Sequence, residues 1–329
     1  MPLGKKIYSH IETGAYLHWA LKDFSGYIAI DEVYDGSFCI LFITDNRQSK
    51  RLMFRVLEKP PTSADILELL QSFQNILASR ELEVKGMTTD GSALYTEPAK
   101  TVFPGVRHQI CEFHVKKEIN KGVLKAVTQV RREVKGKKMK RSKRGRPTTK
   151  EEKVLIRRNE RLDAKVKALF DNRFLFVQKE LTQSERKTLH EITKGFPHLR
   201  KLRELVEEIY RLYDGRCKYS TALKKLKKLR KRLGRFKWLS KVLKKIESST
   251  VERSLLFLED KELPSTSNSV ERGNRRFRKT QKTVYRVRSV GRLRERIALD
   301  MVRDSRLLSR RQTMRALQMA RRTRFHQAC

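Results

Sequence analysis

Two β-rich runs near the start of the chain predict a pair of antiparallel strands. Tyr27–Tyr34 and Ser37–Thr44 are rich in β-branched and aromatic residues, which favour the pleated surface of a sheet. Asp35 and Gly36 lie between them and favour the tight hairpin turn whose twist matches a right-twisted strand pair. Arg51–Leu57 continues the pattern, so we predict three consecutive antiparallel strands.

The following segment predicts one helix and then two further strands. Pro60 and Pro61 interrupt the third strand, and apolar residues then recur at helical spacing over residues 62–80. Val84–Thr89 and Arg107–Phe113 are the next strand candidates. Three antiparallel strands, a helix, a strand, a connection and a last strand follow the order of the ribonuclease H-like fold, which is α/β with a mixed sheet.

From residue 115 to about residue 260 the pattern predicts helices and no strand. Helical spacing occurs over residues 115–134, 150–180, 184–194, 199–213 and 218–247. Within the last stretch a stripe of leucines packs one face, and residues 216–245 carry 14 basic side chains and no acidic one. The simplest interpretation is a helical bundle with a solvated lysine face. A bundle does not explain why every charged residue of this stretch is basic, and a DNA-facing surface explains it better.

The charge of the chain is large and unevenly distributed. The net charge is +40, from 77 basic and 37 acidic residues. Residues 1–114 hold 12 basic and 14 acidic side chains, and the remaining residues hold the other 65 and 23. A charge of this size indicates a polyanionic partner, for which nucleic acid is the first choice. A ribosomal-type or nucleoid-packing protein is the alternative on charge alone.

Simple sequence criteria exclude several other classes. No stretch of 18 uncharged apolar residues is present, so we expect no membrane span. The four cysteines, at positions 39, 111, 217 and 329, lack paired spacing, which argues for a reducing compartment and against a disulfide scaffold.

A short basic segment offers a candidate minor-groove contact. Residues 131–150 contain 11 basic residues and one acidic residue. Arg144 and Arg146 lie there in the sequence KRGRP, which resembles the core of an AT-hook, an extended backbone whose arginines reach into a narrow groove. A disordered basic linker is the alternative.

Three acidic residues are candidates for a metal site. Asp31 ends the apolar run YIAI, where a carboxylate is costly unless something positive compensates it. Asp90 follows the strand candidate that ends in TT, and Glu271 lies in a predicted helix start. Each has a plainer interpretation: a strand-edge acid bonded to local amides, Asp-Gly turn chemistry, and a capping box formed by Asn268 and Glu271.

Taken together, these residues resemble the motifs of DDE transposases. The set comprises Asp31 in YIAIDE, Asp90 in GMTTDGS, Cys111 and His114 in CEFH, and Glu271 in TSNSVERGNRRFRK. The nearest resemblance is to Mutator-like elements and related bacterial insertion-sequence transposases. In that group a ribonuclease H-like core is interrupted, before its last acidic residue, by an all-helical insertion, which matches the strandless stretch.

The resemblance implies a reaction and a cofactor. Asp31, Asp90 and Glu271 would hold two Mg²⁺ ions, or Mn²⁺, for cleavage of double-stranded DNA at transposon ends and transfer of the 3′-hydroxyl into target DNA. A local structural or DNA-positioning role is favoured for Cys111 and His114, because no second pair of cysteine or histidine ligands stands at zinc spacing. The expected phosphate contacts after the helical acid are Arg275, Arg276, Arg278, Lys279 and Lys282.

The resemblance also implies a domain plan. We expect a lead-in at 1–26, the first part of the core at 27–114, a basic helical insertion at 115–260, the last part of the core at 261–300 and a basic tail at 301–329. Relatives usually carry an N-terminal DNA-reading module, so we expect a truncated product, a separate DNA-reading subunit or a reading role for the insertion.

The last expectations concern the oligomeric state and location of the protein and two alternative functions. We expect a homodimer or larger assembly in the prokaryotic cytoplasm or nucleoid, or in a eukaryotic nucleus. Two other functions stay open. One is a ribonuclease H-like nuclease or resolvase, and the other is a transposase-derived DNA-binding protein without catalysis.

Overall fold

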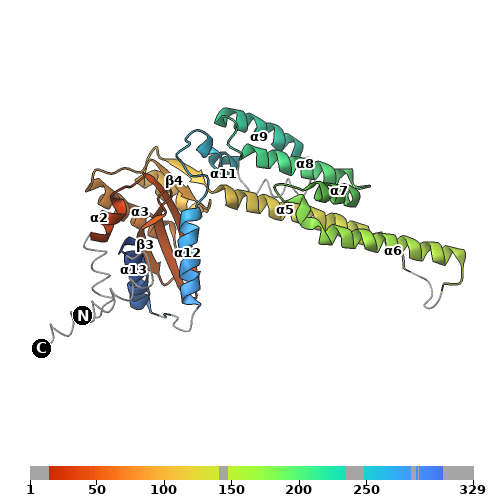
Figure 1. The fold of residues 1–329 in the computed structure, drawn as a ribbon, viewed down its shortest axis with the longest axis horizontal. Coiled ribbons are helices and arrows are strands. Elements are labelled where there is room, and N and C mark those ends of the chain that lie inside the picture. The colour runs from red at the N-terminus through yellow and green to blue at the C-terminus, as the bar shows by residue number, and fades with distance from the viewer. Residues whose placement is uncertain (1–14, 141–146, 234–247, 283–286, 288, 307–329) are drawn as a thin grey trace. The chain divides into compact units, whose positions relative to one another are not determined.

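The computed structural model describes residues 15–140, 147–233, 248–282, 287 and 289–306 (Figure 1). The chain divides into two compact units, one formed by residues 1–111 with 260–329 and the other by residues 112–259. Within the described parts, no helix has the length and apolar character needed to cross a membrane.

The first unit is built on a mixed sheet of five strands, which confirms the predicted α/β class. The strands are β1 (Tyr27–Asp35), β2 (Phe38–Asp45), β3 (Lys50–Leu57), β4 (Gly86–Thr89) and β5 (Arg107–Ile110). Their order in the sheet is β3-β2-β1-β4-β5. The first three strands pair antiparallel, whereas β4 is parallel to both β1 and β5.

The predicted hairpin is confirmed, and one predicted strand is too long. Asp35 pairs with Phe38 across the turn, and Gly36 has a φ of 64°, a conformation that glycine adopts without steric cost. The prediction of a strand over Arg107–Phe113 is wrong beyond Ile110, because helix α5 begins at Glu112.

Helices cover both faces of the sheet. Seven of the eight residues of β2 are buried, as expected for a strand with both faces covered. The covering elements of this unit are α2 (Ala15–Leu21), α3 (Ser63–Ala78), η1 (Ala93–Tyr95), α4 (Thr96–Val102), α12 (Asn268–Gln281) and α13 (Val290–Arg306). Figure 1 shows α12 and α13 beside the strands.

Two neighbouring residues of β1 identify which elements lie on which face. The Asp31 carboxylate is hydrogen bonded to Asn274 of α12, and the Glu32 carboxylate is hydrogen bonded to Tyr95 of η1. Consecutive side chains of a strand point to opposite faces. Therefore α12 covers the Asp31 face, whereas η1 and the helices packed against it, α3 and α4, cover the Glu32 face.

The start of α3 shows how local chemistry sets these elements. Thr62 is the N-cap, its side chain accepts from the Asp65 N–H, and the Asp65 carboxylate accepts from the Thr62 N–H. This capping box satisfies two backbone donors at the helix start. It confirms the helix start predicted just after the two prolines.

The second unit is all-helical within its described residues. Its elements are α5 (Glu112–Gly136), α6 (Lys150–Asp171), η2 (Arg173–Phe176), α7 (Gln183–Ile192), α8 (Pro197–Leu212), α9 (Tyr219–Leu233), α11 (Ser248–Arg253) and η3 (Leu256–Leu258). The predicted single helix over 150–180 is wrong after Asp171, where a short 3₁₀ turn follows. In α9, Leu226 and Leu229 are buried and the lysines between them are exposed, as the bundle interpretation predicts.

Candidate active site

When the strand register is continued past the ends of β4 and β5, Asp31, Asp90 and Cys111 fall at corresponding positions of neighbouring strands. Ala29 of β1 pairs with Thr88 of β4, and Thr88 pairs with Gln109 of β5. Extending this register by two residues aligns Asp31 with Asp90, and Asp90 with Cys111. The Cys111 N–H donates to the Thr89 carbonyl at 2.7 Å, which continues the β4–β5 pairing past the end of both strands.

Hydrogen bonds from the segment before α12 and from α12 itself reach Thr88, Cys111 and Asp31. Thr88 Oγ1 donates to the Pro264 carbonyl at 3.1 Å, and the Ser267 N–H donates to Cys111 Sγ at 3.4 Å. Asn274 Nδ2 donates to Asp31 Oδ2 at 2.7 Å. These contacts direct the side chains of Asp31 and Cys111 toward α12 and its N-cap, and Asp90 follows the end of the strand between them.

A buried asparagine fixes the start of α12 against the sheet. Asn46, at the end of β2, donates from Nδ2 to the Thr266 carbonyl at 2.9 Å and accepts from Ser269 Oγ at 2.6 Å. Asn46 and Ser269 are 8% and 6% exposed, so both bonds are protected from water. They hold the chain on either side of Ser267, the N-cap of α12.

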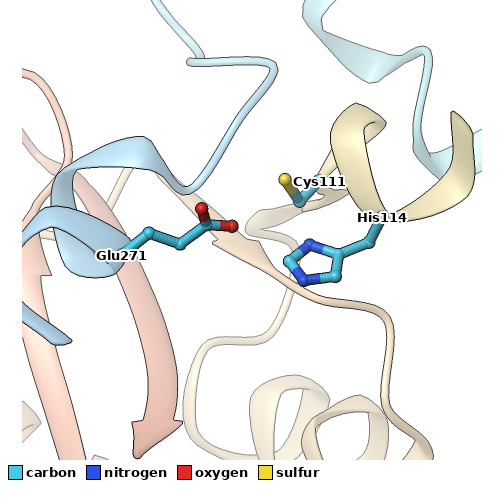
Figure 2. A group of neighbouring side chains, drawn as sticks. All are labelled: Cys111, His114 and Glu271. Atoms are coloured by element: carbon cyan, nitrogen blue, oxygen red, sulfur yellow. The ribbon is translucent and has the colours of Figure 1, made fainter. Parts of the chain in front are cut away.

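Glu271 lies in the first turn of α12 and is half-buried. Figure 2 shows its carboxylate directed toward the Cys111 thiol, and a ligand atom of each lies within 4.8 Å of the other. His114 follows in the first turn of α5, the first helix of the second unit. The capping-box interpretation is wrong, because the N-cap is Ser267 and it makes no side-chain capping bond.

Asp90 combines turn chemistry with a position in the row of strand ends. Its Oδ1 accepts from the Ser92 N–H at 2.8 Å, and the intervening Gly91 has a φ of 92°. The turn interpretation of Asp90 is thus confirmed, but it uses one oxygen of a group that has two. A role in the turn and a role as a ligand are compatible.

Negative charge gathers at this end of the sheet. Tyr95 donates its hydroxyl hydrogen to the Glu32 carboxylate. Burial raises the pKa of Tyr95 well above its ordinary value, and the negative charges of Glu32, Asp90 and Asp31 raise this pKa further. Three carboxylates therefore act on one phenol, and such a concentration of acidic groups favours a bound cation.

Asp31 and Glu271 lie on the α12 side of the sheet and Asp90 follows the end of the neighbouring strand β4, but the three acidic residues do not form one group. Over the described ranges, the potential metal ligands whose atoms lie within 4.8 Å of one another include Glu271 and Cys111 of the first unit, and neither Asp31 nor Asp90. Asp31 has Asn274 as its neighbour on α12 instead.

The oxygen donors in this row fit a magnesium or manganese ion. Asp31, Asp90 and Glu271 offer carboxylate oxygens, and Asn274 adds an amide oxygen that is buried and has no hydrogen-bond partner. Mg²⁺ prefers oxygen ligands, and thiolates suit softer metals. The fully buried Cys111 thiol accepts a backbone N–H, which gives it a structural use at the start of α12.

The predicted phosphate contacts after Glu271 divide into two sets. Arg275, Arg278, Lys279 and Lys282 are exposed, whereas Arg276 is half-buried and forms an ion pair with Asp300 of α13. Arg144 and Arg146 of the AT-hook-like sequence lie outside the described residues.

Asn46, Ser267 and Asn274 are absent from the residues that sequence reasoning selected. For Asn274 a signal existed, because it follows Glu271 by three positions and so shares its helix face. No such signal pointed to Asn46, which is 220 residues from its partner in the chain.

A mixed sheet with carboxylates gathered at one end, covered by a helix that continues into a basic surface, defines a candidate DNA-processing enzyme. A family model for ISL3-type DDE transposases, described as a transposase, matches residues 28–297. The match covers most of the chain, so the chain belongs to this transposase family, whose substrate is DNA. No curated protein matches the sequence.

Proposed function

We propose that this chain is a DDE transposase in which Asp31, Asp90 and Glu271 hold the divalent ions for DNA cleavage and strand transfer. The observation that carries the proposal is the register. Continued two residues past the Ala29–Thr88 pair, it aligns Asp31 of β1 with Asp90, which follows β4, and α12 bears the third acidic residue, Glu271.

The length of α12 supports this grouping. From Ser267, bonded to Cys111, to Asn274, bonded to Asp31, the helix rises by about 10 Å. Two intervals between neighbouring strands also measure about 10 Å. The stretch that carries Glu271 therefore bridges the distance from the end of β5 to β1, and Asp90 follows the strand between them.

The strand order supports a ribonuclease H-like identity for the core. Three antiparallel strands are followed by two strands parallel to the first, in the order that the sequence predicts for that fold. The helical unit at residues 112–259 enters between β5 and α12. This arrangement matches the interrupted core of insertion-sequence and Mutator-like transposases, and we propose that kinship here.

The protein groups have separate tasks in this mechanism. The three carboxylates bind the Mg²⁺ or Mn²⁺ ions, which when bound activate the attacking oxygen and stabilise the leaving 3′-oxygen. Exposed basic residues beyond Glu271, among them Arg275 and Arg278, bind backbone phosphates. Cys111 holds the start of α12 through the Ser267 N–H, which keeps Glu271 in place.

The same chemistry serves both steps of transposition. In the first step, water attacks the phosphorus at the element end, the bond to the 3′-oxygen breaks, and that oxygen takes up a proton to become a 3′-hydroxyl. In the second step this hydroxyl attacks a phosphorus of target DNA, and a 3′-oxygen of the target leaves. We propose a homodimer or larger assembly, because two ends must be joined together.

The test first sequences the DNA on either side of the gene and then uses a labelled fragment that carries the inverted repeat identified there. With Mg²⁺, the parent protein should cut the fragment and join it to a target plasmid. Asp31→Asn, Asp90→Asn and Glu271→Gln should each lower cleavage at least a hundredfold while binding the fragment normally. Glu97→Gln, which changes an exposed carboxylate on α4, is the matched control and should cleave like the parent.

The outcomes separate the three functions. Cleavage without joined product would indicate a nuclease or resolvase, and binding without cleavage by the parent would indicate a DNA-binding protein. Full cleavage by Asp90→Asn would refute the assignment of these acidic residues.

A further inference from the structure

Asn274 is a polar residue at a core position of α12. The helix turns Val270, Asn274, Phe277 and Gln281 toward the sheet, and Asn274 is only 2% exposed. Burying an amide is costly unless its donors and acceptors are all bonded. The side chain at this position therefore needs an explanation beyond packing.

The two ends of the Asn274 amide have different surroundings. Nδ2 donates to Asp31 Oδ2 at 2.7 Å and lies 3.5 Å from the Glu32 carbonyl. Oδ1 is buried and has no hydrogen-bond partner. An acceptor left in this state is energetically costly, so the site holds an oxygen that a ligand or a ligand-bound water can use.

A second amide on the same helix provides the contrast. Gln281 Nε2 donates to Asp35 Oδ2 at 2.7 Å, the same bond to a carboxylate of the same strand. Its Oε1, however, accepts from Arg296 Nη1 at 2.9 Å. The side-chain carbonyl of Gln281 thus accepts a hydrogen bond from another side chain, whereas the side-chain carbonyl of Asn274 accepts none.

We propose that Asn274 belongs to the divalent-cation site. Its Nδ2 fixes the orientation of Asp31, and its Oδ1 accepts a hydrogen bond from water bound to the ion. Groups that orient a ligating carboxylate in this way typically contribute 10–100-fold to metal affinity. This inference rests on the proposed function, because it takes Asp31 as a ligand.

The test measures Mn²⁺ binding to the full-length protein by isothermal titration calorimetry, without DNA. Asn274→Ala should weaken the Kd for Mn²⁺ at least tenfold. Gln281→Ala is the matched control, since it also removes a buried amide bonded to a β1 carboxylate, and its Kd should stay within twofold of the parent value. An unchanged Kd in Asn274→Ala, with thermal unfolding still cooperative, would overturn the proposal.

A second variant decides the matter if Asn274→Ala does not fold. Asn274→Asp keeps an oxygen at Oδ1 and places a second carboxylate against Asp31, a repulsion that a cation relieves. Saturating Mn²⁺ should therefore raise the Tm of Asn274→Asp more than it raises the Tm of the parent. Equal shifts would mean that position 274 does not sense the ion.

The failure of this inference can be told apart from the failure of the proposed function. If the parent does not bind Mn²⁺, or if Asp31→Asn binds it as tightly as the parent, then the metal site itself is refuted and the role of Asn274 with it. If Asp31→Asn abolishes binding but Asn274→Ala does not alter it, only the role of Asn274 is refuted.

Discussion

Replacing Asn46 by alanine tests how α12 is attached to the sheet. The substitution removes two hydrogen bonds, the one to the Thr266 carbonyl and the one from Ser269 Oγ. Each such bond contributes about 0.5–1.5 kcal/mol, and buried groups left unsatisfied add to the cost. We expect the free energy of unfolding of the first unit to fall by about 2–3 kcal/mol, which lowers its Tm by roughly 4–12 °C.

The assay is urea unfolding followed by the fluorescence of Trp19, in a Trp238→Phe background so that the signal reports the first unit. Asn75→Ala removes an exposed asparagine of α3 and should change stability by less than about 0.5 kcal/mol. Because Ser269 precedes Glu271 by two residues, Asn46→Ala should also lower the cleavage rate at a temperature where the protein stays folded. A loss of stability below about 0.5 kcal/mol, with normal cleavage, would refute this account of the attachment.

Three further predictions concern packing, reactivity and DNA binding. Gly86→Ala should destabilise the first unit by about 1–3 kcal/mol in urea unfolding, because the added Cβ would lie 2.7 Å from Leu263 Cδ1; stability equal to the parent would contradict this packing. Burial, followed by the charge of Glu32, raises the pKa of the Cys39 thiol to about 12. Mass spectrometry should therefore find Cys39 unmodified after the folded protein is treated with iodoacetamide at pH 8. Rapid labelling would be inconsistent with the burial of this thiol. Arg276→Ala should lower stability with little effect on the salt dependence of DNA binding, since Arg276 is already ion-paired with Asp300 of α13. Arg275→Ala should instead reduce the slope of log K against log salt by about 1. The reverse result would exchange the roles of the two arginines.

The local pattern of the sequence was sufficient for most elements of the core. The hairpin, the third strand and α3 follow from residue type, turn chemistry and capping, all of which act over a few positions. The end of β5 was missed because Cys111 and Phe113, on either side of Glu112, continue the alternating pattern of a strand. In the structure α5 instead begins at Glu112. A pattern of only three residues does not distinguish a helix from a strand.

The sequence by itself determined which residue types are available for chemistry. It identified Asp31, Asp90 and Glu271, the cysteine and histidine of CEFH, and a cluster of basic residues directly after Glu271. It also determined that the second half of the chain is helical and strongly positive, because periodicity and charge are local properties.

Only the tertiary structure decided how these residues are used. Strand register, continued past the end of β4, aligned Asp31 with Asp90, and the packing of α12 set Asn274 against Asp31 and paired Arg276 with Asp300. Asp31 and Asn274 are 243 residues apart in the chain, and no local rule connects positions at such a distance. Their contact depends on how a helix packs across a sheet, which is decided by the burial of whole elements and not by the residues that finally meet.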